Sequence, residues 1–134
     1  MTDNNKIIIH ETCNTGNIYL RSDKILMFKP FDGVTNCTVK DLEEMYFIYM
    51  DITKGIPHLY YTDNTNIKGF GSEERVYVSE RFHHFAIASA IKENSALVRY
   101  ITHSMLYLNK PQIPLKLFKK EENAINWLKS LQKK

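Results

Sequence analysis

The chain has little of what marks membrane proteins and disulfide-rich secreted proteins. Among its 134 residues are only two cysteines, Cys13 and Cys37, and two thiols do not make a disulfide framework. Its apolar runs are a few residues long, far short of the roughly 20 residues that span a bilayer. No basic segment followed by a long apolar stretch opens the chain, as a secretory signal would require. We therefore expect a cytoplasmic protein with reduced thiols and no membrane span.

The usual signatures of catalysis and of metal binding are missing as well. No Gly-Lys-Ser/Thr phosphate loop and no Gly-x-Ser-x-Gly nucleophile motif occurs. The five histidines never lie at the helical spacing of a zinc pair, and neither cysteine has a Cys-x-x-Cys partner. The sequence thus predicts a protein that is not an enzyme and that needs no cofactor and no metal ion.

Composition indicates one ordinary globular domain. The chain is 43% hydrophobic and 25% charged, which is typical of a soluble fold, and its length suits a single domain over residues 1–134 with residues 1–5 as a disordered tail. The net charge is +3, with lysines concentrated after residue 109. Because no aromatic side chains alternate with these lysines as in a base-stacking surface, we expect no nucleic-acid partner.

The first half of the chain predicts a hairpin followed by a helix. Lys6–His10, Asn17–Arg21 and Lys24–Lys29 have strand patterns, and a turn at Ser22-Asp23 joins the last two strands into an antiparallel pair. Thr38 can then cap a helix, with Asp41 three residues further on. Gly55 and Pro57 end that helix near Lys54.

The second half alternates strands and helices. Strand patterns at His58–Thr62, Phe85–Ile91 and Leu115–Phe118 alternate with helix patterns. The helices are expected at Glu73–Phe82, capped by Ser72, at Ser95–Leu108, capped by Asn94 or Ser95, and at Glu121–Leu131, with Trp127 buried against the sheet. Strands separated by helices indicate βαβ units and a parallel sheet. The predicted fold is α/β: a mixed sheet of four to five strands with an N-terminal antiparallel hairpin, covered by four helices.

Several segments of the chain carry a family resemblance. Asn109-Lys110-Pro111, Pro114–Phe118 and Glu121–Leu128, together with Gly71–Arg75, resemble the SpoIIAA-like superfamily of STAS domains, in an uncharacterised bacterial branch. The resemblance implies a single STAS-like domain with a small mixed sheet and a role in protein–protein regulation. In regulatory STAS domains a Ser or Thr at the start of the second helix accepts phosphate, and Ser72 lies nearest to that position.

The residues themselves offer two weak candidate sites. Gly71 and Ser72 precede a helix whose first amides could face an anion, although Ser72 could equally be a simple helix cap. Asp63 follows a strand at the end where parallel sheets place ligand contacts. Met45, Tyr46 and Tyr49 form a stripe on the first helix, which indicates either core packing or a surface that binds a partner.

Two functions are consistent with these observations. The first is a non-enzymatic regulatory or interaction module, which binds an unknown protein partner or a second copy of itself through the first helix or the edge strand Lys6–His10. The alternative is a binder of a small apolar or anionic ligand in a pocket between sheet and helices. An enclosed apolar pocket with a few polar groups would favour the ligand binder, and an exposed apolar patch would favour the interaction module.

Overall fold

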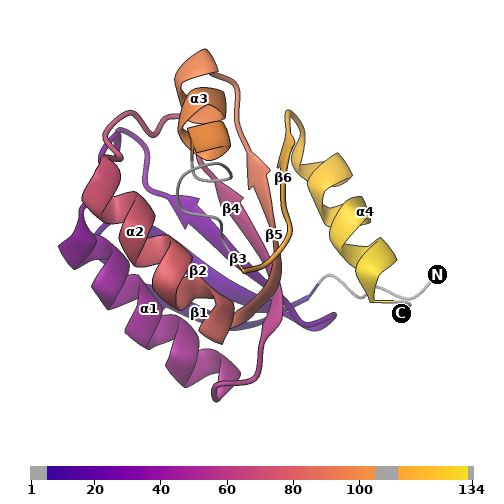
Figure 1. Cartoon of the computed structure of the whole chain (residues 1–134). Coiled ribbons are helices and arrows are strands. Elements are labelled where there is room, and N and C mark those ends of the chain that lie inside the picture. The colour runs from indigo at the N-terminus through magenta and orange to yellow at the C-terminus, as the bar shows by residue number, and fades with distance from the viewer. Residues whose placement is uncertain (1–5, 105–111, 133–134) are drawn as a thin grey trace.

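A computed structural model describes residues 6–104 and 112–132 of the chain and shows one sheet with helices on both faces (Figure 1). Two predictions concern residues outside the described ranges: the disordered tail at residues 1–5 and the end of the third helix at residues 105–108. The strands are β1 (Ile7–Thr12), β2 (Gly16–Arg21), β3 (Ile25–Pro30), β4 (His58–Asp63), β5 (Ala86–Lys92) and β6 (Leu115–Phe118). The helices are α1 (Val39–Thr53), α2 (Ser72–Arg81), the 3-10 turn η1 (Phe82–His84), α3 (Ala96–Ser104) and α4 (Glu121–Leu131).

The sheet follows the order of the chain. Its strands lie in the order β1-β2-β3-β4-β5-β6, antiparallel from β1 to β3 and parallel from β3 to β6. The predicted hairpin and the predicted βαβ crossovers are therefore confirmed. The expected number of strands is wrong, because the sheet has six. Both edge strands pair with their neighbours, β1 with β2 between Ile7 and Thr12 and β6 with β5 from Leu115 to Phe118.

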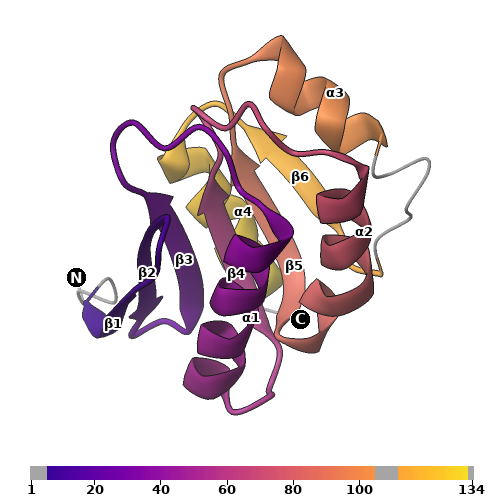
Figure 2. The ribbon, with the colours of Figure 1, turned by 90° about the vertical axis from the view of Figure 1, so that its left-hand side faces the viewer.

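Two hydrophobic cores lie on the two faces of the sheet, with α1 and α2 in front and α4 behind in Figure 2. Alternate residues of β3 contribute to the two cores: Leu26 and Phe28 face the α1 side, whereas Ile25 and Met27 face α4. All four are buried, as expected for a central strand covered on both faces. No helix within the described ranges is long and apolar enough to cross a bilayer.

An aromatic cluster fills the core on the α1 side. Phe85 is completely buried, with its ring centroid 4.4 Å from that of Tyr49 and 4.8 Å from that of Phe82. Tyr49 is also fully buried, its hydroxyl 2.8 Å from the Tyr60 hydroxyl, and Met45 is 3% exposed. The interpretation of Met45 and Tyr49 as surface contacts is therefore wrong, because α1 turns both toward the sheet.

The ends of the helices follow their local sequence only in part. Thr38 caps α1 as predicted, and α1 ends with Lys54 in the left-handed conformation (φ 57°) ahead of Gly55. For α2 the prediction is wrong, because Gly71 is the cap and Ser72 is the first helical residue. The Glu74 carboxylate accepts the Gly71 N–H at 2.7 Å, so a glutamate of the first turn satisfies the amide of the capping residue.

The helices α3 and α4 begin close to the predicted positions. Ser95 Oγ accepts the Val98 N–H at 3.0 Å, which confirms Ser95 as the cap of α3. On α4, Ala124, Ile125 and Leu128 are buried against the sheet. Trp127 packs against the same core as predicted, with its ring centroid 5.8 Å from that of Phe118, and the side chain is partly exposed.

The cap of α1 makes a testable contribution to stability. Asp41 N–H donates to Thr38 Oγ1, and the Asp41 carboxylate accepts the Thr38 N–H, both at 3.1 Å. Burial opposes ionisation of Asp41, but hydrogen bonds from Asn14 and Thr38 outweigh it and lower the pKa of this carboxyl. We expect Asp41→Ala to lower the free energy of unfolding by about 1 kcal/mol at pH 7.

The pH dependence of this effect has a definite sign. A carboxyl whose pKa is lowered by folding stabilises the fold above its unfolded pKa of about 4, and the contribution is lost as pH falls through the folded pKa. The difference between wild type and Asp41→Ala in urea denaturation should therefore shrink below pH 4. Asp51→Ala, an exposed aspartate on the same helix, is the control. An equal loss of free energy of unfolding in both variants would contradict the stabilising role of Asp41 in the cap of α1.

Candidate functional site

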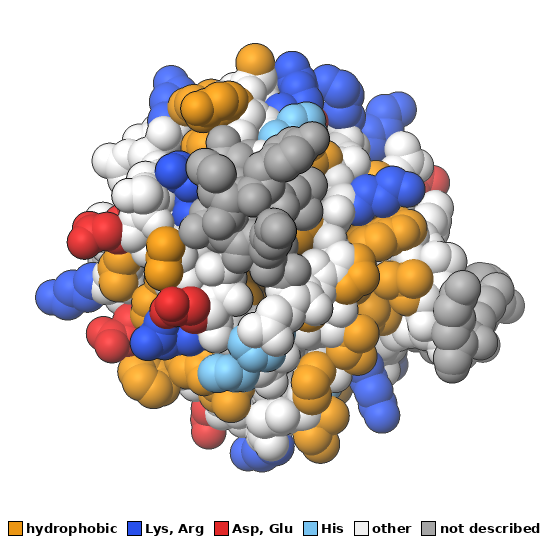
Figure 3. Space-filling view, in the orientation of Figure 1, with side chains coloured by type: hydrophobic (Ala, Val, Ile, Leu, Met, Phe, Trp, Pro, Cys, Tyr) orange, Lys and Arg blue, Asp and Glu red, His pale blue; other side chains and the backbone are white. Residues whose placement is uncertain are grey.

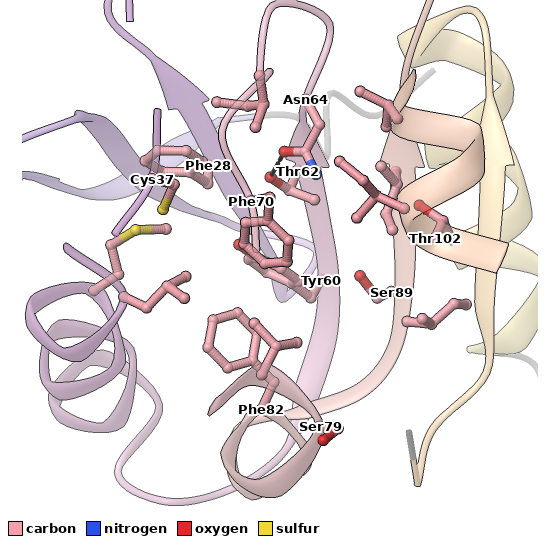
Figure 4. Close-up of a pocket in the computed structure, with 18 of the residues that line it drawn as sticks. Phe28, Cys37, Tyr60, Thr62, Asn64, Phe70, Ser79, Phe82, Ser89 and Thr102 are labelled. Carbon is pink, nitrogen blue, oxygen red and sulfur yellow. Dashed lines mark hydrogen bonds between the residues drawn. The ribbon is translucent and has the colours of Figure 1, made fainter. Parts of the chain in front are cut away.

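A pocket of about 100 Å³ lies between the sheet and the helices on the α1 side (Figure 4). Strands β3, β4, β5 and β6 and the helices α1, α2 and α3 all contribute side chains to it. Protein cores seldom hold voids much larger than a water molecule, which needs about 10–15 Å³ of such space. The pocket therefore has room for more than a single water molecule and is the main candidate site in the described part of the chain.

The walls of the pocket are predominantly apolar. Phe28 of β3, Phe70 before α2 and Phe82 of η1 surround it, and Val98 and Ile101 close it from α3. Figure 4 shows the Phe70 and Tyr60 rings at the centre of the site and Phe82 below them. Aromatic and branched side chains of this kind favour an apolar ligand body.

A few polar groups converge on this apolar space. Thr62 Oγ1 donates to Asn64 Oδ1 at 2.9 Å at the carboxyl end of β4. Ser89 on β5 and Thr102 on α3 also line the pocket, and each is only 5% exposed. In open parallel sheets, ligands bind beyond the carboxyl ends of the strands, and the Thr62–Asn64 end of the pocket has this position.

The buried titratable side chains of the pocket are held neutral. Burial raises the pKa of the Cys37 thiol to about 12, and the nearby Asp41 carboxylate adds to the shift. Burial also raises the pKa of Tyr60 well above its usual value, despite opposing hydrogen bonds with Tyr49 and Thr62. A reactive cysteine needs a lowered pKa, so Cys37 has the character of a buried apolar group, not of a nucleophile.

The α3 wall is held in place by an ion pair between the buried Glu93 carboxylate and the exposed Arg99 side chain. The Glu93 side chain is 3% exposed, and its Oε1 accepts from Arg99 Nη1 at 3.1 Å and from the Ser95 N–H at 2.9 Å. Because both bonds connect the end of β5 to α3, they position Val98, Ile101 and Thr102 over the pocket. Buried carboxylates are stable only when paired in this way.

Removing the arginine tests how much this pair stabilises α3. We expect Arg99→Ala to lower the free energy of unfolding by about 2 kcal/mol, because it leaves the buried Glu93 carboxylate with one fewer charged partner. Lys29→Ala breaks the exposed Lys29–Glu121 pair, in which both side chains are 40% exposed, and should change stability by less than about 0.5 kcal/mol. Urea denaturation measures the free energy of unfolding of both variants. Similar losses in Arg99→Ala and Lys29→Ala would contradict a stabilising role for the Arg99–Glu93 pair.

The anion-site candidates Asp63, Gly71 and Ser72 lie outside this pocket, whereas Met45 of the α1 stripe lines it. Asp63 accepts from the Thr65 N–H at 3.0 Å and pairs with Lys92 at 3.8 Å, so its carboxylate stabilises a turn. Ser72 is exposed on α2, and the Gly71 amide is occupied by Glu74, which leaves that amide unavailable to an anion. The structure does not bring Asp63 and Ser72 together in the pocket, and Ser72 as a phosphoacceptor stays a prediction.

Of the predicted contact residues on α1, Tyr46 alone reaches the surface. It is half-buried, and its hydroxyl lies 2.7 Å from His84 Nδ1. Figure 3 shows charged side chains of both signs dispersed over one face of the molecule, with hydrophobic side chains between them. In the described part of the chain, no three His, Cys, Asp or Glu side chains gather as metal ligands would.

Sequence reasoning missed Ser89 and Thr102. The signal that could have identified Ser89 was a single hydroxyl in the otherwise apolar strand Ala86–Ile91, because a polar side chain in a buried strand needs a partner. Thr102 lies directly beside the apolar Ile101 of α3. Since helical positions one apart differ in direction by about 100°, its inward orientation depends on how α3 sits on the sheet.

This architecture places the protein among the SpoIIAA-like folds. A crystal structure of an uncharacterised protein of the DUF3478 family with a SpoIIAA-like fold, from Shewanella loihica PV-4, is similar with a TM-score of 0.56 at 17% sequence identity. The match covers 96% of this chain and 98% of that chain, and it confirms the predicted SpoIIAA-like fold. A family model described as a domain of unknown function (DUF7793) matches residues 18–132, so the chain belongs to that family. No curated protein matches the chain significantly.

Proposed function

We propose that this protein acts by binding a small, mostly apolar ligand in the pocket between the sheet and α1, α2 and α3, without catalysing a reaction. The observation that carries the proposal is the pocket itself, about 100 Å³ of space lined mainly by apolar side chains. Ligand sites are typically apolar cavities with a small number of polar groups that orient the ligand. Of the two functions that the sequence suggested, this geometry favours the ligand binder.

The size of the pocket limits the ligand. At about 10–15 Å³ per ordered water on the same measure, 100 Å³ holds several waters or one compact organic molecule of roughly ten non-hydrogen atoms. Replacing poorly ordered water by an apolar group increases affinity. Phe28, Phe70 and Phe82 supply aromatic contact area for such a molecule.

Ethylbenzene, an uncharged probe of suitable size, tests the proposal. Titrated into the ¹⁵N-labelled protein, it should shift amide signals of β4, β5 and α3 with a saturable profile. Ser89→Leu fills the pocket and should abolish these shifts. Ser130→Leu makes the same substitution at an exposed position of α4 and should leave them unchanged. Circular dichroism checks that both variants are folded.

Two results would overturn this proposal. One is the absence of saturable ethylbenzene binding to the wild type. The other is equal loss of binding in Ser89→Leu and Ser130→Leu while both are folded, which would place the probe outside the pocket.

The exposed edge of the sheet supports a second candidate, pairing with another copy of this chain. β1 is an edge strand on which Ile7 is 47% exposed and Ile8 is 59% exposed. Proteins usually protect such edges, since unpaired backbone groups beside apolar side chains invite strand pairing. Light scattering after size exclusion should then show a dimer that Ile8→Lys dissociates, whereas a monomeric wild type at high concentration would exclude this candidate.

A further inference from the structure

Two hydroxyls that line the pocket have no hydrogen-bond partner among the described residues. Among the described residues, neither Ser89 Oγ nor Thr102 Oγ1 has a hydrogen-bond partner, although each side chain is 5% exposed. The other hydroxyls differ, because Thr62 donates to Asn64 and Ser79 donates to the Val76 carbonyl. In Figure 4 the Ser89 and Thr102 oxygens point into the pocket, whereas the Ser79 oxygen points away from it.

Leaving such hydroxyls unpaired is unfavourable. Once a ligand displaces the water from the pocket, a hydroxyl that finds no hydrogen bond on the ligand loses its solvation, at a cost of about 1–3 kcal/mol. Buried polar groups are therefore bonded to protein, to water or to a ligand in almost all proteins. Ser89 on β5 and Thr102 on α3 can both donate to an acceptor that lies between the sheet and the helix.

The described residues that line the pocket offer a charged ligand no permanently charged counter-ion. None of the lining residues in the described ranges is Asp, Glu, Lys or Arg, and the raised pKa keeps the Cys37 thiol neutral. His83 is the one described lining side chain that could gain a positive charge, and its Nδ1 is buried without a hydrogen-bond partner among the described residues. Moving an ionised group from water into such surroundings is strongly unfavourable.

We propose that the ligand is an uncharged molecule with an apolar body and one oxygen acceptor, such as a ketone or an ester, which accepts hydrogen bonds from Ser89 Oγ and Thr102 Oγ1. The inference rests on the proposed function and specifies the chemistry of the same pocket. It separates an uncharged ligand from the anionic ligand that the sequence left open.

Four probes of similar size and different charge test this chemistry. Ethylbenzene, acetophenone, benzoate and 1-phenylethylammonium share one aromatic ring. Their affinities are measured by the same NMR titration at pH 8.5, where imidazoles ordinarily carry no charge. Acetophenone should bind at least tenfold more tightly than benzoate or 1-phenylethylammonium. Comparable binding of either charged probe would overturn the inference, while ethylbenzene binding would still support the proposed function.

Variants of the two hydroxyls test the hydrogen bonds directly. Ser89→Ala and Thr102→Val should each weaken acetophenone binding about fivefold, the effect of one lost hydrogen bond, without weakening ethylbenzene binding. Ser79→Ala is the matched control, because that hydroxyl already bonds to a backbone carbonyl. Equal weakening of both probes would indicate a change of pocket shape and overturn the role of the hydroxyls, as would unchanged acetophenone binding in both variants. Absence of ethylbenzene binding to the wild type would instead reject the proposed function.

Discussion

Replacing Phe85 by alanine is expected to lower the free energy of unfolding by about 3–5 kcal/mol. Phe85 is 0% exposed and lies at the centre of the aromatic cluster. Its ring centroid is 4.4 Å from Tyr49, 4.8 Å from Phe82 and 5.5 Å from Tyr60. These rings belong to α1, η1 and β4, so they cannot all move inward to fill the space that the lost phenyl group leaves.

The control for this prediction is the same substitution on the surface. Phe47 lies on α1 but is 62% exposed, and Phe47→Ala should change stability by less than about 0.5 kcal/mol. Urea denaturation followed by circular dichroism measures both variants. A loss below about 1 kcal/mol for Phe85→Ala would mean that the cluster does not anchor α1 to the sheet.

Gly16→Ala is expected to destabilise the protein by about 3 kcal/mol through overpacking. A Cβ atom at Gly16 would lie 2.5 Å from the Lys29 carbonyl oxygen and 2.6 Å from Pro30 Cα. Both atoms belong to the backbone of β3, which pairs with Gly16. No change of rotamer can relieve this overlap, so the start of the β2–β3 pairing must shift, together with the neighbouring Thr15 that lines the pocket.

Gly33 provides a control that distinguishes the cost of steric overlap from the cost of an unfavourable backbone conformation. Gly33 has a φ of +86°, and a Cβ atom placed there would meet no described atom within 4 Å. Gly33→Ala should therefore cost only the conformational term, about 1 kcal/mol. Thermal and urea denaturation compare the two variants. If Gly16→Ala is no more destabilising than Gly33→Ala, β2 and β3 are not as closely apposed at this end as the structure places them.

Much of the fold could be predicted because its signals are local. Ile25–Pro30 alternates between two buried faces, Thr38 and Asp41 form a capping box, and Ser95 caps α3. Each of these depends on residues within a few positions of one another. The parallel arrangement of β3 to β6 also follows from the sequence, because strands that alternate with helices have few other ways to form one sheet.

The errors in the prediction concern features that depend on distant neighbours or on competing caps. Ser72 has the residue type of a helix cap, but Glu74 bonds to Gly71 and moves the cap by one residue. Met45 and Tyr49 look the same on a helical wheel whether the stripe faces a core or a partner.

By itself the sequence determined the order of the elements and the mixed sheet, because hydrophobic periodicity and turn residues act over short distances. The SpoIIAA-like fold was expected from the family resemblance of a few motifs. Only the tertiary structure decided that a pocket exists and that Ser89 and Thr102 share it. A cavity is the space that remains when α1, α2 and α3 pack on the sheet. Its size and its polar lining therefore depend on the positions of several elements at once, which no local pattern in the chain records.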